Sequence, residues 1–303
     1  MDILFRTCEQ LTVETRRLEL LLELSRLGSM REVAERLRTT TSTVSQQIAV
    51  LAREVGTPLL EPDGRRVRLT PAGRRLAAHA ATILAAVEAA RADLDPAAEP
   101  AGTLRVGGFA TAIRRAVLPV VARLAADHPR VHVLIHEYEP AESLALVASD
   151  HLDLALVYDY DLAPRTKDPV LQWVPLWTTP WSIGVPQSLA HADSTFLAGQ
   201  PWIVNSRNTA DTEVARTLAS LAGFEPRITH QADSLTLVED LILAGQGIGL
   251  LPADRPTPRG ITLVPLRNPQ VHLRAYAVTR PGRSEWPPLA LVLGLLDSPQ
   301  TTH

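Results

Sequence analysis

Six polar side chains stand close together between residues 41 and 47. They are Thr41, Ser42, Thr43, Ser45, Gln46 and Gln47. Glutamine can bond an adenine edge through two atoms, and a threonine methyl group can meet a thymine methyl group. This chemistry suits the reading of base edges in the major groove of double-stranded DNA. The alternative is a helix N-terminus that is simply rich in capping residues.

The residues around this segment predict helices joined by tight turns. Leucines at helical spacing predict a helix over residues 16–27, and Ser29 with Glu32 three residues later predicts the start of a second helix over 30–37. A third helix over 41–54 turns its apolar side inward through Val44, Ile48 and Leu51. Because its other side carries the six polar residues, the arrangement is that of a helix-turn-helix.

A small basic hairpin is predicted next. The pair Asp63-Gly64 is a hairpin turn signal, and residues 65–69 alternate as a strand does. In this prediction Val67 and Leu69 face inward and the arginines face outward. A hairpin beside a helix-turn-helix is a wing, whose arginines would lie along phosphates or enter a minor groove.

Positive charge is concentrated in the same region. The whole chain has a formal net charge of −3, whereas residues 36–75 hold eight arginines against three carboxylates, a net of +5. Such a patch is a candidate phosphate surface. The alternative is a solvated face of an arginine-rich chain, since Lys167 is the only lysine. Besides the six polar residues, the predicted DNA contacts are Ser29, Thr40, Arg53, Arg65, Arg66 and Arg68.

A long helix and a linker follow the wing. Thr70-Pro71 predicts the start of an alanine-rich amphipathic helix over residues 71–95. We interpret it as a dimerisation helix, the alternative being a helix packed on its own domain. The segment 96–102, rich in proline, alanine and glycine, marks a domain boundary.

Beyond the linker, strands alternate with helices, which predicts an α/β domain with a parallel sheet. The predicted strands are 103–109, 131–137, 153–158, 181–186, 201–205, 227–231, 247–252, 261–266 and 273–280. The predicted helices are 113–127, 141–149, 212–222, 234–244 and 288–296. Ligands of such sheets bind beyond the carboxyl ends of strands. The candidate residues there are Phe109, Ala110, Thr111, Tyr158, Asn205, Ser206 and Arg207.

Other apparent motifs carry little chemistry. Glycines 245, 247 and 249 follow a helix and enter a strand, the reverse of a phosphate loop. His132 and His136 share a strand face, but no carboxylate or cysteine completes a metal site. We expect no cofactor and no catalytic constellation.

No apolar stretch predicts a membrane span. Cys8, the only cysteine, favours the cytoplasm.

The chain resembles the LysR-type transcriptional regulators. The resemblance rests on GSMREVAERLRTTTSTVSQQIAVLAREVGTPLL with RRVRLTPAGRRL, and later on GTLRVG, HLDLALVY and GQGIGLLP. It implies an α+β chain with a winged helix-turn-helix (1–70), a linker and dimerisation helix (71–95) and a two-lobed, periplasmic-binding-protein-like effector domain (103–297). Lobe I would hold 103–160 and 261–297, and lobe II 161–260. The implied partners are promoter DNA, a small-molecule effector and other copies of the chain in a homotetramer.

The sequence also departs from this family. Thr41 stands where the family usually has glutamine, and Gln46 where it often has arginine. Leu59-Leu60 and Glu61-Pro62 replace a stretch that often carries phenylalanine and arginine. The operator therefore cannot be inferred by analogy. The competing readings are a solute-binding protein with an incidental N-terminus and a small-molecule enzyme. Salt-dependent binding to the chain's own upstream DNA would separate all three.

Overall fold

The N-terminal part of the chain is helical with one hairpin. The structure, a computed structural model, describes residues 13–63, 66–95, 99–190 and 196–297. The first six elements are α1 (Thr15–Leu27), α2 (Met30–Arg36), α3 (Thr41–Glu54), β1 (Leu60–Asp63), β2 (Arg66–Leu69) and α4 (Pro71–Leu94). The predicted helix-turn-helix is present, and β1 pairs antiparallel with β2 as a wing.

Local capping sets the ends of these helices. Gly28 ends α1 in the left-handed conformation, with φ 67°. Ser29 accepts a hydrogen bond from the backbone amide of Glu32 and so caps α2. Thr70 caps α4 by accepting from the Gly73 amide at 2.9 Å, with Pro71 in the first turn.

One core unites the helix-turn-helix with the first turns of α4. Its buried residues include Leu18, Leu21, Leu24, Val33, Val44, Ile48, Leu51, Ala77, Ala80 and Ala81. The alanine side of α4 therefore packs on α1 of its own domain, as the alternative interpretation of this helix predicts. One prediction for the wing is wrong. Val67 is 39% exposed because it borders a cavity, whereas Leu69 of the same strand packs against the core.

The C-terminal domain contains all the remaining elements. Its first part comprises β3 (Gly102–Gly108), α5 (Ala110–Ala112), the π-helical segment η1 (Ile113–Val117), α6 (Leu118–Asp127), β4 (Val131–Glu137), α7 (Pro140–Ala148) and β5 (Leu154–Tyr160). Its middle part comprises β6 (Gln172–Pro186), the 3₁₀ turns η2 (Gln187–Leu189) and η3 (Phe196–Gly199), β7 (Pro201–Val204), α8 (Ala210–Leu221), β8 (Arg227–Gln231) and α9 (Leu235–Leu243). It ends with β9 (Ile248–Pro252), β10 (Ile261–Val264), β11 (Val271–Thr279), η4 (Arg283–Glu285) and α10 (Pro287–Asp297).

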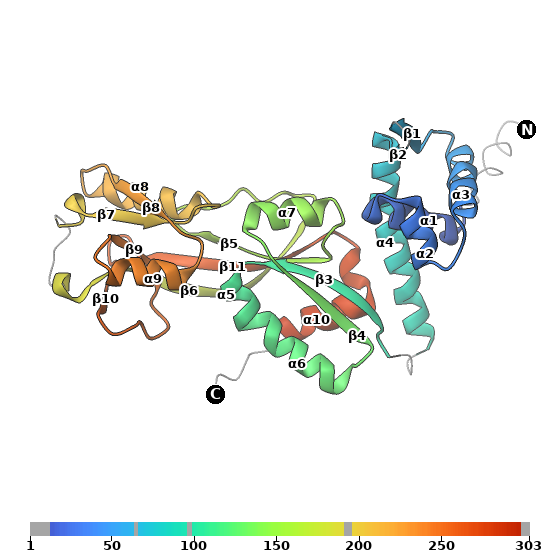
Figure 1. The fold of residues 1–303 in the computed structure, drawn as a ribbon. Helices are drawn as coiled ribbons and strands as arrows, with labels where there is room; N and C mark the ends of the chain where they lie inside the picture. Colours follow the sequence, from blue (N-terminus) through green and yellow to red (C-terminus); the bar gives the residue numbers. More distant parts are fainter. Residues whose placement is uncertain (1–12, 64–65, 96–98, 191–195, 298–303) are drawn as a thin grey trace, which may run out of the picture.

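These elements form two lobes on one continuous sheet, whose strand order is β4-β3-β5-β11-β6-β9-β7-β8 with β10 on β6. Lobe I consists of β3, β4 and β5 with α6, α7 and α10, and lobe II of β7, β8 and β9 with α8 and α9 (Figure 1). Within each lobe, neighbouring strands such as β3 and β4 or β7 and β8 run parallel, as predicted. The strands that join the lobes, β5, β11 and β6, are antiparallel.

The joining strands are longer than the sequence predicts. β6 begins at Gln172 rather than at 181, and β5 continues to Tyr160. The early part of β6 holds Pro175 and Pro180, which argue against a strand. A register shift against β11 between Ala275 and Tyr276 lies opposite Pro175 and accommodates it. The first helix of the domain also starts earlier than predicted, at Ala110.

The glycines before β9 have the packing role that we predicted. Gly245 ends α9 with φ 69°. A Cβ at Gly247 would lie 2.6 Å from the Pro201 carbonyl oxygen, so the backbone of β7 leaves room for glycine only. Across the described ranges, no helix is both long and apolar enough to cross a membrane.

Candidate functional site

The polar residues of α3 lie on the side of this helix away from its core. Thr41, Ser42, Thr43, Ser45 and Gln46 are all exposed, while Val44, Ile48 and Leu51 are buried on the opposite side. Thr40 caps the helix by accepting from the Thr43 amide at 3.1 Å, and its hydroxyl lies 2.8 Å from those of Ser42 and Thr43. The first turn of α3 is therefore held in place by hydrogen bonds among hydroxyl residues.

Two other predicted DNA contacts have local partners, and a third lines a groove. Gln47 is half-buried, and its side-chain oxygen accepts from Arg17 of α1 at 3.0 Å. Ser29 is half-buried and caps α2. Arg53 is exposed at the last turn of α3, where it lines a mostly apolar groove of about 490 Å³ with Thr57 and Pro58.

The wing presents one described arginine side chain to solvent. Arg68 of β2 lies opposite Glu61 of β1 in the hairpin register, and their side chains pair at 2.9 Å. Both are exposed, so a DNA phosphate could compete with Glu61 for this guanidinium. Arg66 begins β2, whereas Arg65 and the tip glycine of the predicted turn lie outside the described residues.

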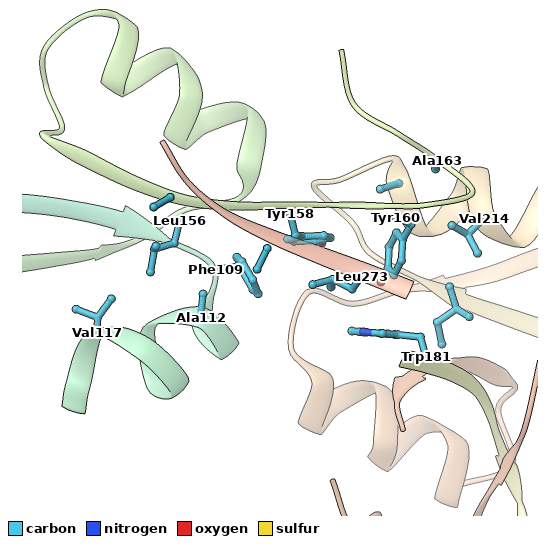
Figure 2. Close-up of a cluster of buried hydrophobic side chains, with 14 of the residues drawn as sticks. Phe109, Ala112, Val117, Leu156, Tyr158, Tyr160, Ala163, Trp181, Val214 and Leu273 are labelled. Atoms are coloured by element: carbon cyan, nitrogen blue, oxygen red, sulfur yellow. The ribbon is translucent and has the colours of Figure 1, made fainter. Parts of the chain in front are cut away.

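The predicted effector residues lie where the two lobes meet. Phe109 follows β3, and its ring stands edge-on to Tyr158 of β5, with centroids 4.7 Å apart. Tyr158 contacts Tyr160, and Tyr160 contacts Trp181 of β6, so an aromatic chain runs from lobe I to the joining strands (Figure 2). Ala110 and Thr111 form the start of α5 beside Phe109.

The corner after β7 is built by side-chain to backbone hydrogen bonds. The buried Asn205 accepts from the amides of Arg207 at 2.8 Å and Asn208 at 2.9 Å through its side-chain oxygen. Ser206 donates its amide and its hydroxyl to Asp233. Although burial would raise the pKa of Asp233, hydrogen bonds from Ser206 and Arg207 hold it below its usual value.

Two ion pairs connect the lobes. Arg207 of lobe II pairs with Asp233 at 2.6 Å and reaches Glu142 of α7 at 3.4 Å. Arg115 of η1 pairs with Asp254, just after β9, at 3.0 Å and lies over the Trp177 ring. In Figure 1, α7 lies above the joining strands and α5 below them, so the two pairs fasten the lobes on both sides. Arg207, one of the predicted effector residues, is thus already paired with carboxylates of the protein.

The sequence prediction missed the buried acids of this region. Glu139 lies beside the Tyr158 hydroxyl, which donates to it at 3.4 Å, and burial raises the pKa of Glu139. Burial also raises the pKa of Asp211, to about 6, with the Tyr160 hydroxyl as its hydrogen-bond partner. Glu139 and Glu142 form a capping box at the start of α7, a spacing that a search for helix N-termini could have found.

Comparisons with known proteins agree with this geometry. Residues 15–74 match the model of the bacterial regulatory helix-turn-helix protein, lysR family, and residues 97–298 match the LysR substrate binding domain. The chain belongs to the LysR family. It is therefore a DNA-binding transcriptional regulator with an effector-binding domain and not an enzyme, and the resemblance seen in the sequence is confirmed.

Several individual LysR-family proteins are similar over nearly their whole length. The transcriptional dual regulator GltC of Bacillus subtilis is 27% identical over 89% of this chain and 94% of its own. OxyR of Escherichia coli, a DNA-binding transcriptional dual regulator, is 27% identical over 91% and 93%. Among solved structures, a full-length OxyR variant from Pseudomonas aeruginosa is 20% identical over 94% of both chains, with a TM-score of 0.72. HinK from the same organism has a TM-score of 0.54 at 22% identity and covers 95% and 99%.

Proposed function

We propose that this LysR-family regulator reads its operator through the exposed side of α3 and holds the flanking phosphates with its wing. The observation that carries the proposal is the exposure of Thr41, Ser45 and Gln46 on the helix that follows the tight turn. The remaining contacts proposed are Ser29, Thr40, Ser42, Thr43, Gln47, Arg53, Arg65, Arg66 and Arg68.

Fluorescence anisotropy with the regulator's own upstream DNA tests the wing. Arg68→Ala should weaken binding to every sequence and flatten the slope of log affinity against log salt by about 0.9, because one phosphate contact is lost. Arg91→Ala is a matched control, since Arg91 is a similarly exposed arginine paired with Glu88 at the far end of α4. Equal salt slopes for Arg68→Ala and the unchanged protein would refute the wing contact.

The effector is proposed to bind at the corner between the lobes. The residues proposed for it are Phe109, Ala110 and Thr111 of lobe I, Tyr158 of a joining strand, and residues 205–207 of lobe II. Buried polar groups from both lobes converge there, and a ligand that replaced the contact between Arg207 and Glu142 would change how the lobes are held together. The corner could therefore both recognise the effector and change the orientation of the lobes when the effector binds.

A thermal-shift screen of the full chain tests the corner. Amino acids, dicarboxylates, aromatic acids and sugar phosphates would be screened, because a ligand present at 100 times its Kd stabilises the folded state by about 2.7 kcal/mol. Ser206→Ala and Tyr158→Phe should both reduce the shift given by a hit. Ser284→Ala, which removes a hydroxyl of η4 that donates to Gln172 at the start of β6, should not. A full shift in both corner variants would place the effector elsewhere.

We infer that the working form is a homotetramer in the cytoplasm, in which α4 pairs subunits. The domain limits proposed are 1–70, 71–95 and 103–297, with lobe I at 103–160 and 261–297 and lobe II at 161–260. Ile83 and Leu94 leave apolar surface exposed on α4, at 43% and 86%, which supports pairing through this helix.

Some relatives are named as activators of hydrogen peroxide-inducible genes. A cysteine-based response within residues 97–298 is excluded here, because Cys8 is the only cysteine.

A further inference from the structure

An arginine of the DNA-binding domain is buried against the effector domain. Arg26, in the last turn of α1, pairs with Asp150 of the loop between α7 and β5, with Nη2 and Oδ2 3.0 Å apart. The two side chains are 17% and 4% exposed, so little water screens the pair. Burial lowers the pKa of Arg26, but attraction to Asp150 and Glu23 outweighs it and leaves the pKa raised. Arg26 thus keeps its positive charge.

Asp150 also joins the linker helix to this contact. Arg280, directly after β11, lies 3.6 Å from Asp150 and donates to the Ala78 carbonyl of α4 at 2.7 Å. Thr82, one turn further along α4, donates to the Pro281 carbonyl at 3.3 Å. We call Arg26, Asp150 and Arg280 the latch, because together they tie α1, α4 and lobe I to one carboxylate.

The loop that carries Asp150 is itself fixed. Asp153, three residues on, pairs with Arg105 of β3 at 2.9 Å and with Arg283 of η4 at 3.0 Å. Burial alone would raise the pKa of Asp153, yet the hydrogen bond from Arg105 and the charges of Arg105 and Arg283 lower it to about 2. Asp150 has a left-handed backbone, with φ 62°. Because its loop is held by these contacts, the Asp150 carboxylate can set the position of the arginines that pair with it.

The interface beside the latch is loosely filled. A cavity of about 540 Å³ lies between the domains, lined by Gly28 of α1's end, Arg75 of α4, and Ser149 and His151 of lobe I. The polar side chains of the latch lie beside this cavity, whereas α4 packs against η4 and α10 elsewhere in the interface.

Helix α7 links the latch to the corner between the lobes. Its N-terminal turn carries Glu142, which contacts Arg207 of lobe II, and Asp150 follows its C-terminus by two residues. The helix has nine residues and is about 13 Å long, short enough to move as a rigid rod. Figure 1 shows α7 lying over β5.

We propose that the latch fixes the orientation of the winged helix on lobe I and that α7 transmits the state of the interlobe corner to it. Release of the Arg207 contact at one end of α7 would shift the rod and loosen Asp150 from Arg26 at the other. The transmission step rests on the proposed effector corner, whereas the latch itself does not.

Distance measurements between two spin labels on the full chain test the proposal without any ligand. In a Cys8→Ser background, labels at Glu35→Cys on α2 and His132→Cys on β4 occupy exposed positions in the two domains. Dilution with excess unlabelled protein restricts the signal to one chain. The unchanged protein should give one narrow distance distribution. Arg26→Gln should raise the population of other distances roughly 10- to 100-fold, because charge-assisted hydrogen bonds are lost.

Controls separate the latch from general loss of structure. Arg36→Ala removes another arginine that pairs with Glu23 but does not touch lobe I, and should keep the narrow distribution. Arg26→Lys keeps the charge and should restore most of it. Asp150 keeps Arg280 as a partner in Arg26→Gln, so this variant should fold, as circular dichroism would verify. A narrow distribution in folded Arg26→Gln overturns the latch.

Glu142→Gln tests the transmission step. It weakens the contact with Arg207 at the far end of α7. The distance distribution should broaden, and the additional distances should be those seen in Arg26→Gln. If Arg26→Gln broadens the distribution and Glu142→Gln leaves it narrow, α7 does not transmit and that part of the proposal is overturned. Neither outcome depends on where the effector binds, so a wrong effector corner would be recognised separately by the thermal-shift screen.

Discussion

Gln46 and Gln47 are adjacent in α3 but have different surroundings. Gln46 is exposed, whereas Gln47 is half-buried and accepts a hydrogen bond from Arg17. A glutamine that is held by its own domain has less freedom to bond a base through both side-chain atoms. The sequence pattern treats the two alike, and only their contacts show that Gln46 is better placed to select a base.

Gln46→Ala should therefore reduce sequence discrimination more than it reduces overall affinity. We expect a loss of about 1–3 kcal/mol of discrimination at one base pair, measured by anisotropy with upstream DNA and its single base-pair variants. The salt slope should not change, because no phosphate contact is removed. Gln47→Ala should instead destabilise the domain by about 1 kcal/mol through the lost Arg17 contact. Unaltered discrimination at every position in Gln46→Ala would contradict the assignment.

The buried carboxyl of Asp211 predicts a pH-dependent stability. Its pKa is about 6 in the folded chain against a usual value of 3.8, so between about pH 4 and pH 6 the folded state binds more protons than the unfolded state. Stability should therefore fall as pH rises through this range and then level off. Asp211→Asn should abolish this fall, so that urea unfolding at pH 5 and pH 7.5 shows a relative gain for the variant at pH 7.5. Asp240→Asn, which alters an exposed carboxylate of α9, should follow the unchanged protein at both values.

At the scale of elements, the sequence predicts helices and strands that are governed by local signals. The limits of α3, β4 and β8 agree with the predicted ranges, because capping residues and apolar spacing act within a few residues. The first half of β6 was missed because Pro175 and Pro180 suggest a loop, and its strand geometry comes from hydrogen bonds to β11, about a hundred residues away.

The candidate sites also divide into those set by local sequence signals and those set by contacts between distant segments. The reading side of α3 could be predicted, since one helix carries it. The capping-box spacing of Glu139 and Glu142 could have been found, but it does not show that Glu139 is buried. Asp211 could not be predicted as a buried acid, because its partner Tyr160 comes from a distant segment that approaches it only through the fold. The latch residues Arg26, Asp150 and Arg280 were missed for the same reason.

Close packing of α4 on the helix-turn-helix gives a prediction for Gly73. A Cβ there would lie 2.3 Å from the Leu59 carbonyl oxygen, which belongs to the backbone and cannot turn away. Gly73→Ala should destabilise the DNA-binding domain by about 1–3 kcal/mol, as overpacking does, and this can be measured by urea unfolding. Gly294→Ala on α10 is the contrasting case, since the added methyl group meets nothing within 4 Å. It should stabilise by up to about 1 kcal/mol through helix propensity. Equal effects from the two changes would argue against the packing explanation.

At the scale of the whole molecule, the exposed apolar side chains of α4 bear on assembly. Ile83 is 43% exposed on a helix whose alanines already pack on its own domain. If α4 pairs subunits, Ile83→Asp should weaken the assembly, which sedimentation velocity across a dilution series would detect as a smaller species. Val170→Asp alters a still more exposed residue, at 70%, in the loop before β6 and should leave the assembly intact. An unchanged sedimentation coefficient for Ile83→Asp at all concentrations would exclude pairing through this side of α4.

The unbroken sheet has a mechanical consequence. Because β6 and β11 pair along most of their length and carry both lobes, the lobes cannot swing apart about a flexible linker without breaking ladder hydrogen bonds. Any change in their relative orientation must instead be elastic, as added twist and coil in three neighbouring strands. The register shift at Ala275 and Tyr276 is where such bending strains the fewest bonds. The effector domain thus bends elastically through its central strands. The stiffness of that bulge sets how far a bound molecule can change the orientation of the two lobes.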